Sequence, residues 1–240
     1  MTLLTLEGIR ARIEGVPVLR EVDLSVDTAE SVAIVGRNGA GKTSTFRTVM
    51  GLRNLDQGTI TFGGEDITDS STPDRKRLGI GFAPEDRRLI SKLTARENIE
   101  MALWGSDDGA EIDFDERLEM MLDIFPMMNE FLDRGAGKLS GGQQQMVAVS
   151  RALVSKPDLV LLDEPFEGLA PSIRKDLRES ISTTRDELGT SLFIAESQLS
   201  HVKGVVDRLY VIERGEIIAE IDDPAAVESN DELMRVISGG

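Results

Sequence analysis

The chain has 240 residues, of which 40% are hydrophobic and 4% aromatic, so it is long enough to bury an aliphatic core. Its net charge of −16 argues against nucleic acid or anionic lipid as a direct partner, and the absence of cysteine excludes disulfides and thiolate metal sites. No apolar run approaches the roughly 20 residues of a membrane span, and the N-terminus lacks the basic and apolar regions of a signal peptide.

The N-terminal part of the chain predicts strands around a single helix. Residues 1–27 are expected to form strands, with apolar and polar residues alternating in VDLSV over 22–26. The apolar run SVAIVG over 31–36 is typical of a strand buried on both faces. A helix over 41–51 and a short strand over 58–64 follow.

The middle of the chain changes character and predicts helices. They are expected over 95–104, 114–125 and 141–155, and the second and third are closed by prolines. The polar stretch over 105–113 is the best candidate for a loop. We interpret residues 86–155 as a helical insert.

The C-terminal part returns to alternating elements. A buried strand is predicted over 158–165, a helix over 171–188 and another strand over 191–197. A hairpin over 208–221 turns at residues 214–215, and a short helix ends the chain. Strands that alternate with helices at both ends of the chain predict an α/β fold.

The stretch GRNGAGKT, residues 36–43, follows a buried strand and begins a helix, which is the context that a phosphate-binding loop requires. Its glycines let the backbone approach phosphates, and the amides from Asn38 to Ser44 can point inward at the helix N-terminus. Lys42 is expected at the β- and γ-phosphates of ATP, Thr43 at Mg²⁺ and Ser44 at the α-phosphate. The candidate nucleotide-binding residues here are Gly36, Arg37, Asn38, Gly39, Ala40, Gly41, Lys42, Thr43 and Ser44.

Two adjacent acids end the apolar strand of LVLLDEP. Asp163 is expected to hold Mg²⁺, and Glu164, whose side chain points the other way, is expected to orient and deprotonate the attacking water. Beside a phosphate-binding loop, this pair predicts ATP hydrolysis.

A second loop, LSGGQQQ over 139–145, has glycines and a helix N-terminus but no lysine. It is a poor primary nucleotide site and a good cap for a γ-phosphate held elsewhere. Here the chain resembles the ATP-binding subunits of ABC transporters, whose signature motif is LSGGQ. The resemblance covers nearly the whole chain, with GRNGAGKT, APEDRR, LSGGQQQ, LVLLDEP and EGLAPS in that order.

The resemblance implies a single ABC-type ATP-binding domain over 1–240. Its α/β fold would have a P-loop NTPase core with a RecA-like, mainly parallel sheet, an antiparallel β layer and a helical subdomain over 86–155. It also implies that two subunits pack head to tail, so that the signature loop of each covers the ATP held by the other. The signature residues are Ser140, Gly141, Gly142 and Gln143.

The motifs PEDRR and EGLAPS are similar to one branch of the family, the importers of branched-chain amino acids, related hydrophobic amino acids and urea. Glu85 replaces a glutamine of most members and is expected to bind Mg²⁺. The resemblance implies a separate membrane permease, an external solute-binding protein and a place at the cytoplasmic face of the membrane. The partner ATPase is identical or paralogous.

Two positions depart from the family pattern. Ser197 stands where a switch histidine is usual, and its hydroxyl can bond a γ-phosphate. Ile13 stands where an aromatic residue usually stacks on adenine, so it offers apolar contact or is simply a strand residue. The lone histidine, His201, is expected to be a packing or surface residue. The resemblance implies that the helical insert receives a helix of the membrane subunit; Trp104 could belong to that contact, but we expect it to lie in the core of the insert.

Other functions stay open at this point. One is a cytosolic ABC ATPase of DNA repair or translation, although such proteins usually show two ATPase halves, a coiled-coil insert or a basic surface. Another is a module that closes on ATP but turns over poorly, given Ser197. The sequence does not indicate the transported solute. The acidic excess is typical of a soluble acidic protein, and a second hypothesis is adaptation to a salty cytoplasm.

Overall fold

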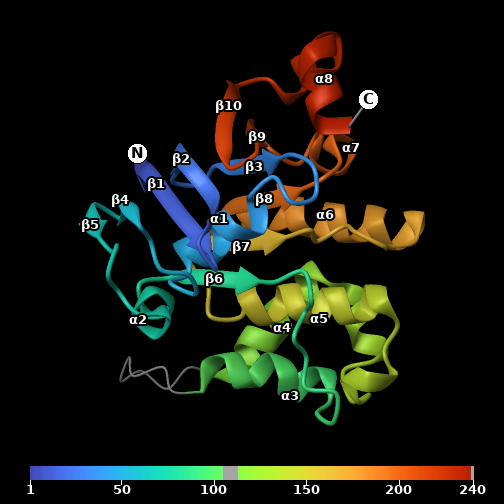
Figure 1. The fold of residues 1–240 in the computed structure, drawn as a ribbon. Helices are drawn as coiled ribbons and strands as arrows, with labels where there is room; N and C mark the ends of the chain where they lie inside the picture. The colour runs from blue at the N-terminus through green and yellow to red at the C-terminus, as the bar shows by residue number, and fades with distance from the viewer. Residues whose placement is uncertain (105–112, 239–240) are drawn as a thin grey trace.

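The computed structural model describes residues 1–104 and 113–238, so the loop predicted over 105–113 lies outside them except for its last residue. The described residues form one ten-stranded sheet in the order β5-β4-β1-β2-β10-β9-β3-β8-β7-β6 (Figure 1). The strands are β1 (Thr2–Ile13), β2 (Val16–Asp27), β3 (Ser31–Val35), β4 (Gln57–Phe62), β5 (Glu65–Asp66), β6 (Ile80–Ala83), β7 (Leu159–Asp163), β8 (Ser191–Glu196), β9 (Arg208–Glu213) and β10 (Glu216–Ile221). The helices are α1 (Lys42–Val49), α2 (Thr72–Arg77), α3 (Ala95–Glu100), α4 (Phe114–Ile124), α5 (Gly141–Leu153), α6 (Pro171–Leu188), α7 (Leu199–Val202) and α8 (Asp231–Ser238).

One half of the sheet is parallel. Strands β9, β3, β8, β7 and β6 pair in parallel, and every residue of β3, β7 and β8 is buried. Burial on both faces explains why these three strands are continuous apolar runs in the sequence. Because parallel strands end at the same edge, the segments after β3, β6, β7 and β8 meet there.

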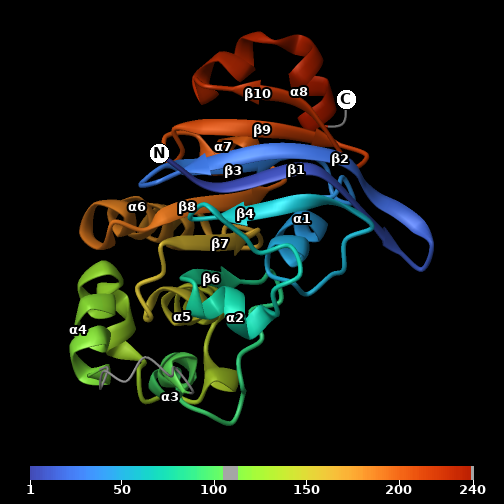
Figure 2. The ribbon, with the colours of Figure 1, turned by 90° about the vertical axis from the view of Figure 1, so that its left-hand side faces the viewer.

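The other half is antiparallel, except that β10 pairs in parallel with β2. β1 pairs with β2 and β4, β4 pairs with β5, and β10 pairs with β9, all antiparallel. The long strands β1 and β2 run side by side in Figure 2. Buried and exposed residues alternate along much of β2, as the sequence predicted, because one face of this layer is in contact with solvent. The predicted antiparallel layer and mainly parallel core are confirmed.

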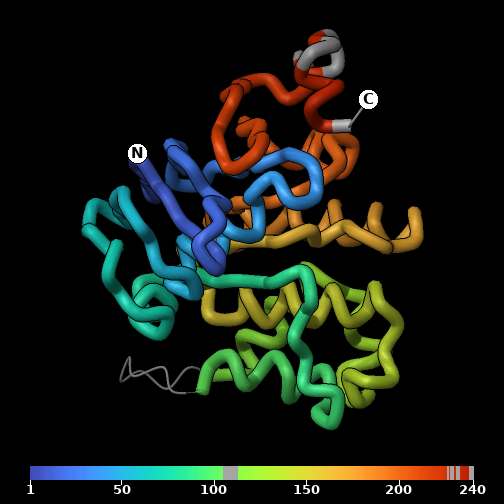
Figure 3. The backbone as a smooth tube through the Cα atoms, viewed as in Figure 1, coloured from blue at the N-terminus to red at the C-terminus, as the bar shows by residue number. Residues whose placement is uncertain are grey.

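Helices cover the sheet and define two hydrophobic cores. α1 contributes Phe46 and Val49 to one core, and α6 contributes Leu177 and Ile181 to the other. Helices α3, α4 and α5 gather beyond β6, on the side away from β10 (Figure 1). In Figure 3 the chain passes from the end of β6 down to the start of α3.

Four features differ from the sequence predictions. The helix expected over 95–104 ends at Glu100 and continues as a 3-10 turn over Met101–Leu103. Trp104 is 63% exposed, so the prediction that it lies in the core was wrong. The strand β6 and the helix α2, which Ser71 caps through its side chain, were not predicted because both are short and lie among charged residues.

Candidate nucleotide site

The phosphate-binding loop joins β3 to α1 at the carboxyl edge of the parallel strands. Gly36 is required for close packing, because a Cβ there would lie 2.3 Å from the carbonyl oxygen of Ile212. Gly41 is the N-cap residue of α1 and has a φ of +124°, which glycine adopts readily. No side chain at this position caps the helix. The first amides of α1 therefore lack a side-chain cap and can receive an anion.

The ammonium group of Lys42 is buried inside this loop. Its Nζ donates to the carbonyl oxygens of Gly36 at 2.7 Å and Arg37 at 3.3 Å, and it lies 3.0 Å from Oε1 of Glu164. An ammonium group has three hydrogens, so all of its donors are engaged. The Lys42 and Glu164 side chains are each 5% exposed, which makes this a buried ion pair.

Asp163 ends β7 next to the start of α1. Its Oδ1 accepts a hydrogen bond of 3.1 Å from Thr43 Oγ1, whereas its buried Oδ2 has no hydrogen-bond partner among the residues that the structure describes. Burial raises the pKa of Asp163 to about 6; the bond from Thr43 opposes this rise, and the charges of Glu85 and Glu164 add to it. A buried carboxylate oxygen without a donor fits a hard cation that takes its remaining ligands from phosphate and water.

Glu164 follows Asp163 and has a φ of +49°, which is uncommon for a residue with a side chain. Its backbone amide donates to Ala195 at 2.9 Å, and its Oε2 accepts from the amide of Ser197 at 3.1 Å and from the Ser197 hydroxyl at 3.3 Å. Ser197 therefore contacts the candidate base directly. Its hydroxyl is a hydrogen-bond donor to Glu164 in this state.

Lys42, Thr43 and Glu164 line one hollow of about 380 Å³, whereas Asp163 and Ser197 do not. Ile13, which is 42% exposed, lies at this hollow together with the phosphate loop, as expected for a residue that contacts a base. The residues that line it are Ile13, Val18, Asn38, Gly39, Gly41, Lys42, Thr43, Ser44, Glu85, Glu164 and Glu167. The structure thus brings together the phosphate loop, Glu85 and Glu164.

The signature residues lie elsewhere, at the start of α5. Ser140 accepts from the amide of Gln143, and the Gln143 side chain accepts from the amide of Ser140, a reciprocal cap of the helix. Ser140 and Gly141 are exposed, and none of the four signature residues lines the hollow. A Cβ on Gly142 would lie 2.6 Å from Ile173. The signature loop is therefore separate from the hollow at the phosphate loop of its own chain.

Two arginines, which the sequence analysis did not single out, join the Glu85 loop to α5. Arg87 Nε donates to Gln145 Oε1 at 2.8 Å, and Arg151 donates to the carbonyl oxygens of Arg87 and Arg88 at 2.6 and 2.9 Å. Arg87 and Arg88 both have positive φ values. The loop that carries Glu85 is therefore fixed to the helix that carries the signature motif. The only sequence signal for this connection between the Glu85 loop and α5 is the pair of arginines in PEDRR.

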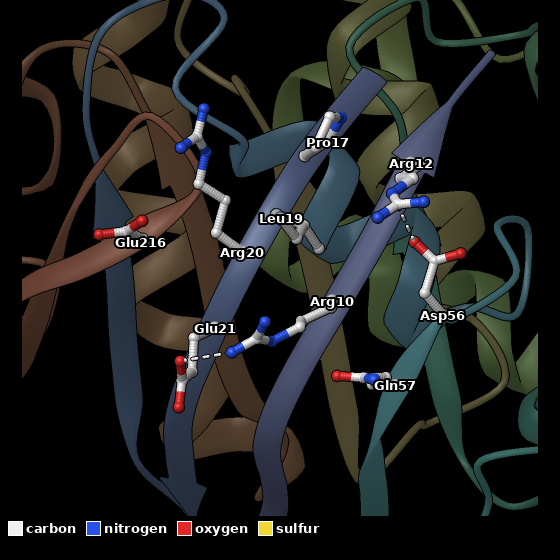
Figure 4. Close-up of a pocket in the computed structure, with 9 residues that line it drawn as sticks. All are labelled: Arg10, Arg12, Pro17, Leu19, Arg20, Glu21, Asp56, Gln57 and Glu216. Carbon is white, nitrogen blue, oxygen red and sulfur yellow. Dashed lines mark hydrogen bonds and ion pairs between the residues drawn. The ribbon is translucent and has the colours of Figure 1, made fainter. Parts of the chain in front are cut away.

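A second hollow, of about 590 Å³, lies on the outer face of β1, β2 and β4 (Figure 4). Three arginines line it, but Arg10 is paired with Glu21 at 2.7 Å and Arg12 with Asp56 at 3.8 Å. No part of the phosphate loop lines this hollow. It is larger than the hollow at the phosphate loop, yet the groups suited to ATP chemistry lie in the smaller one.

The model of the family described as ABC transporter matches residues 19–167. The chain belongs to this family. The branched-chain amino acid transport ATP-binding protein BraG of Pseudomonas aeruginosa is 34% identical, over 99% of this chain and 100% of that protein. The lipopolysaccharide export ATP-binding protein LptB of Haemophilus influenzae is 33% identical, over 100% and 98%. The ADP conformation of the ABC cassette MJ1267 superimposes with a TM-score of 0.82 and 27% identity, over the full length of both chains.

This ABC ATPase is therefore the ATP-binding subunit of a transporter and binds nucleotide. Within the described residues, no helix is long and apolar enough to cross a membrane. The resemblance drawn from its motifs is confirmed, and so is the P-loop NTPase fold.

Proposed function

We propose that this ABC ATPase hydrolyses ATP between two protomers and powers the import of branched-chain or related hydrophobic amino acids. The observation that supports hydrolysis most strongly is the convergence of Lys42, Asp163 and Glu164 at the carboxyl edge of β3 and β7. The phosphates would bind to the amides of residues 36–44. We further propose that residues 1–240 form one cassette, with 86–155 as its helical subdomain.

Phosphate binding would release the candidate base. All three Lys42 donors are engaged, so a phosphate oxygen can bind Lys42 only by replacing one of them. The carboxylate of Glu164 is the acceptor that a phosphate would repel, whereas the two backbone carbonyls are fixed by the loop. Glu164 would then stay bonded to Ser197 and turn its free oxygen toward a water molecule, whose proton it accepts during attack on the γ-phosphate.

Thr43, Asp163 and Glu85 would hold Mg²⁺ at the edge of the same hollow. The unpartnered Oδ2 of Asp163 and the hydroxyl of Thr43 supply oxygen ligands of the kind that Mg²⁺ prefers. The bound ion would neutralise charge on the β- and γ-phosphates. Glu85 is exposed, lines the hollow and supplies a further carboxylate.

A second protomer, identical or paralogous, would complete the site. The exposed Ser140 and Gly141 lie at the N-terminus of the 13-residue helix α5, and they do not line the hollow at the phosphate loop of their own chain. In a head-to-tail pair they would cover the γ-phosphate held by the other protomer, with Gly142 and Gln143 behind them. The family resemblance supports this arrangement.

The permease would bind this subunit near Trp104. That contact would attach the subunit to the cytoplasmic face of the membrane. A groove of about 560 Å³ lies there, lined by Leu78, Leu103, Trp104 and Pro157 among others. Family members receive a helix of the membrane subunit on this face. Trp104→Ala is expected to weaken binding to the permease and leave basal ATP hydrolysis unchanged.

The solute assignment depends on the motifs PEDRR and EGLAPS and on two relatives. Two relatives are described as branched-chain amino acid transport ATP-binding proteins. They are BraG and the probable LivF of Archaeoglobus fulgidus, which is 30% identical to this chain. LptB is almost as similar, so transport must be measured directly. We expect permease proteoliposomes with this subunit and an external binding protein to accumulate labelled leucine; failure with leucine and with other hydrophobic amino acids would overturn the assignment.

Hydrolysis is tested by two matched glutamate variants. Glu164→Gln removes the base and is expected to lower kcat about 100-fold or more. Glu167→Gln changes an exposed acid of the same hollow and is expected to keep the wild-type rate. Equal rates for Glu164→Gln and the wild type would contradict the assignment of Glu164.

A further inference from the structure

A buried carboxylate lies on the core side of the central strand. Leu192 and Ile194 of β8 pack in one hydrophobic core, and Glu196, two residues further on, points to the same side. Glu196 is fully buried. An ionised carboxylate at such a position is costly unless its oxygens are hydrogen-bonded, so its partners indicate what it does.

Both oxygens of Glu196 have partners, and both partners lead to the turn that follows Glu164. Oε1 accepts a bond of 3.1 Å from the amide of Phe166, two residues after Glu164. Oε2 lies 2.9 Å from Nδ1 of His201. The buried His201 ring also packs edge-on against the Phe166 ring, with 6.1 Å between centroids.

This turn needs support because its backbone is strained. Glu164 has a φ of +49°, in the left-handed region that a residue with a side chain adopts at a cost. The turn is closed by a bond of 3.2 Å from the amide of Glu167 to the carbonyl of Glu164. Once a phosphate takes Lys42, the Glu164 side chain keeps its bonds to Ser197. Its direction then depends on the backbone that Glu196 holds.

The surroundings of His201 specify where its proton lies. Nε2 of His201 is buried without a hydrogen-bond partner in the described part of the chain, and a buried N–H without an acceptor is rarely tolerated. The neutral ring with its proton on Nδ1 satisfies Glu196 and leaves only a lone pair unbonded.

The same bond favours the ionised form of the Glu196 carboxyl group. Burial raises the pKa of Glu196 to about 7, the bond from His201 lowers it, and the charge of Glu164 raises it. Without His201 the carboxyl group would hold a proton at neutral pH.

We propose that His201 and Glu196 are positioning residues that hold the turn of Glu164 in the geometry for attack on ATP. The proposal rests on the role proposed above for Glu164. His201, which the sequence predicts to be a packing or surface residue, thereby acts on the site through Glu196 and Phe166.

The chain has a single histidine, so one nitrogen-15 NMR experiment on tag-free protein reports on His201 alone. At pH 8 we expect a proton on Nδ1 and none on Nε2. In Glu196→Gln, the side-chain amide can donate to Nδ1, so the proton is expected to move to Nε2. A wild-type ring with its proton on Nε2, or a ring that exchanges freely between both forms, would overturn the pairing.

Steady-state kinetics of the full-length protein test the effect on catalysis. His201→Leu removes the donor and is expected to lower kcat about tenfold, with the KM for ATP nearly unchanged. His201→Asn places an amide donor near the position of Nδ1 and is expected to recover most of the rate. Val202→Ala, which removes buried volume from the same helix, serves as the control and is expected to keep the wild-type kcat.

The outcomes separate this proposal from the assignment of Glu164. If Glu164→Gln is inactive while His201→Leu hydrolyses ATP at the wild-type rate, the positioning role is refuted and the base assignment stands. If Glu164→Gln retains full activity, the base assignment fails, whereas the NMR result still decides the His201–Glu196 pairing. If Val202→Ala loses as much kcat as His201→Leu, the effect is one of packing and the positioning role is refuted.

Discussion

The buried ion pair between Lys42 and Glu164 gives a quantitative prediction for the nucleotide-free protein. Their charged atoms lie 3.0 Å apart, and both side chains are 5% exposed. Breaking a buried pair by removing one partner costs about 3–5 kcal/mol, because the other charge stays buried. In Lys42→Met, Glu164 keeps two hydrogen bonds from Ser197, so we expect the low end of this range, about 3 kcal/mol, in the free energy of unfolding.

The double variant Lys42→Met with Glu164→Gln removes both charges. Because no uncompensated charge remains, we expect a total loss of about 1 kcal/mol, smaller than that of Lys42→Met alone. Urea unfolding followed by far-UV circular dichroism, without nucleotide or Mg²⁺, measures each value, and Glu167→Gln controls for loss of an exposed acid. Equal losses for the single and double variants would refute a charge interaction between Lys42 and Glu164.

Three further predictions concern charge and the Glu85 loop. Because the pKa of Asp163 is raised to about 6, the folded protein loses stability as the pH rises from about 4 to 6 and Asp163 ionises. Asp163→Asn should therefore stabilise the metal-free protein by about 2 kcal/mol at pH 8. Equal stabilisation at pH 4 would contradict this. With a net charge of −16, the unfolding free energy should rise with KCl through screening, and a stability independent of KCl would argue against salt adaptation. Arg151→Met removes the two hydrogen bonds to the carbonyl oxygens of Arg87 and Arg88. It should lower the free energy of unfolding in urea by about 3 kcal/mol and lower kcat. An unchanged kcat would show that these bonds do not contribute to catalysis.

Most of the fold could be predicted from hydrophobic pattern. The predicted helix over 171–188 and hairpin over 208–221 match α6, β9 and β10, because their apolar spacing and Gly215 turn are local signals. The strand β6 has only four residues, which is too short to show a period. Trp104 was misplaced because apolar character predicts burial on average and does not tell which residue of a short helical turn faces solvent.

The candidate site was predictable where a motif carries it. The loop over 36–43 and the acids Asp163 and Glu164 come together because strands β3 and β7 end at one edge of the sheet. The Lys42–Glu164 and Glu196–His201 pairs were not predicted, since each depends on how separate elements pack. A glutamate at a core-facing position of an apolar strand was the available signal for Glu196.

The central claim is that ATP is held by Lys42 of one protomer and covered by Ser140 of another. The molar mass of Glu164→Gln in solution, measured by light scattering with and without Mg-ATP, tests it most directly. We expect a monomer without ATP and a dimer with ATP, formed with an identical chain or with a paralogous ATPase, and we expect Ser140→Arg to abolish the dimer. A Glu164→Gln protein that stays monomeric with ATP and every candidate partner subunit would contradict the account.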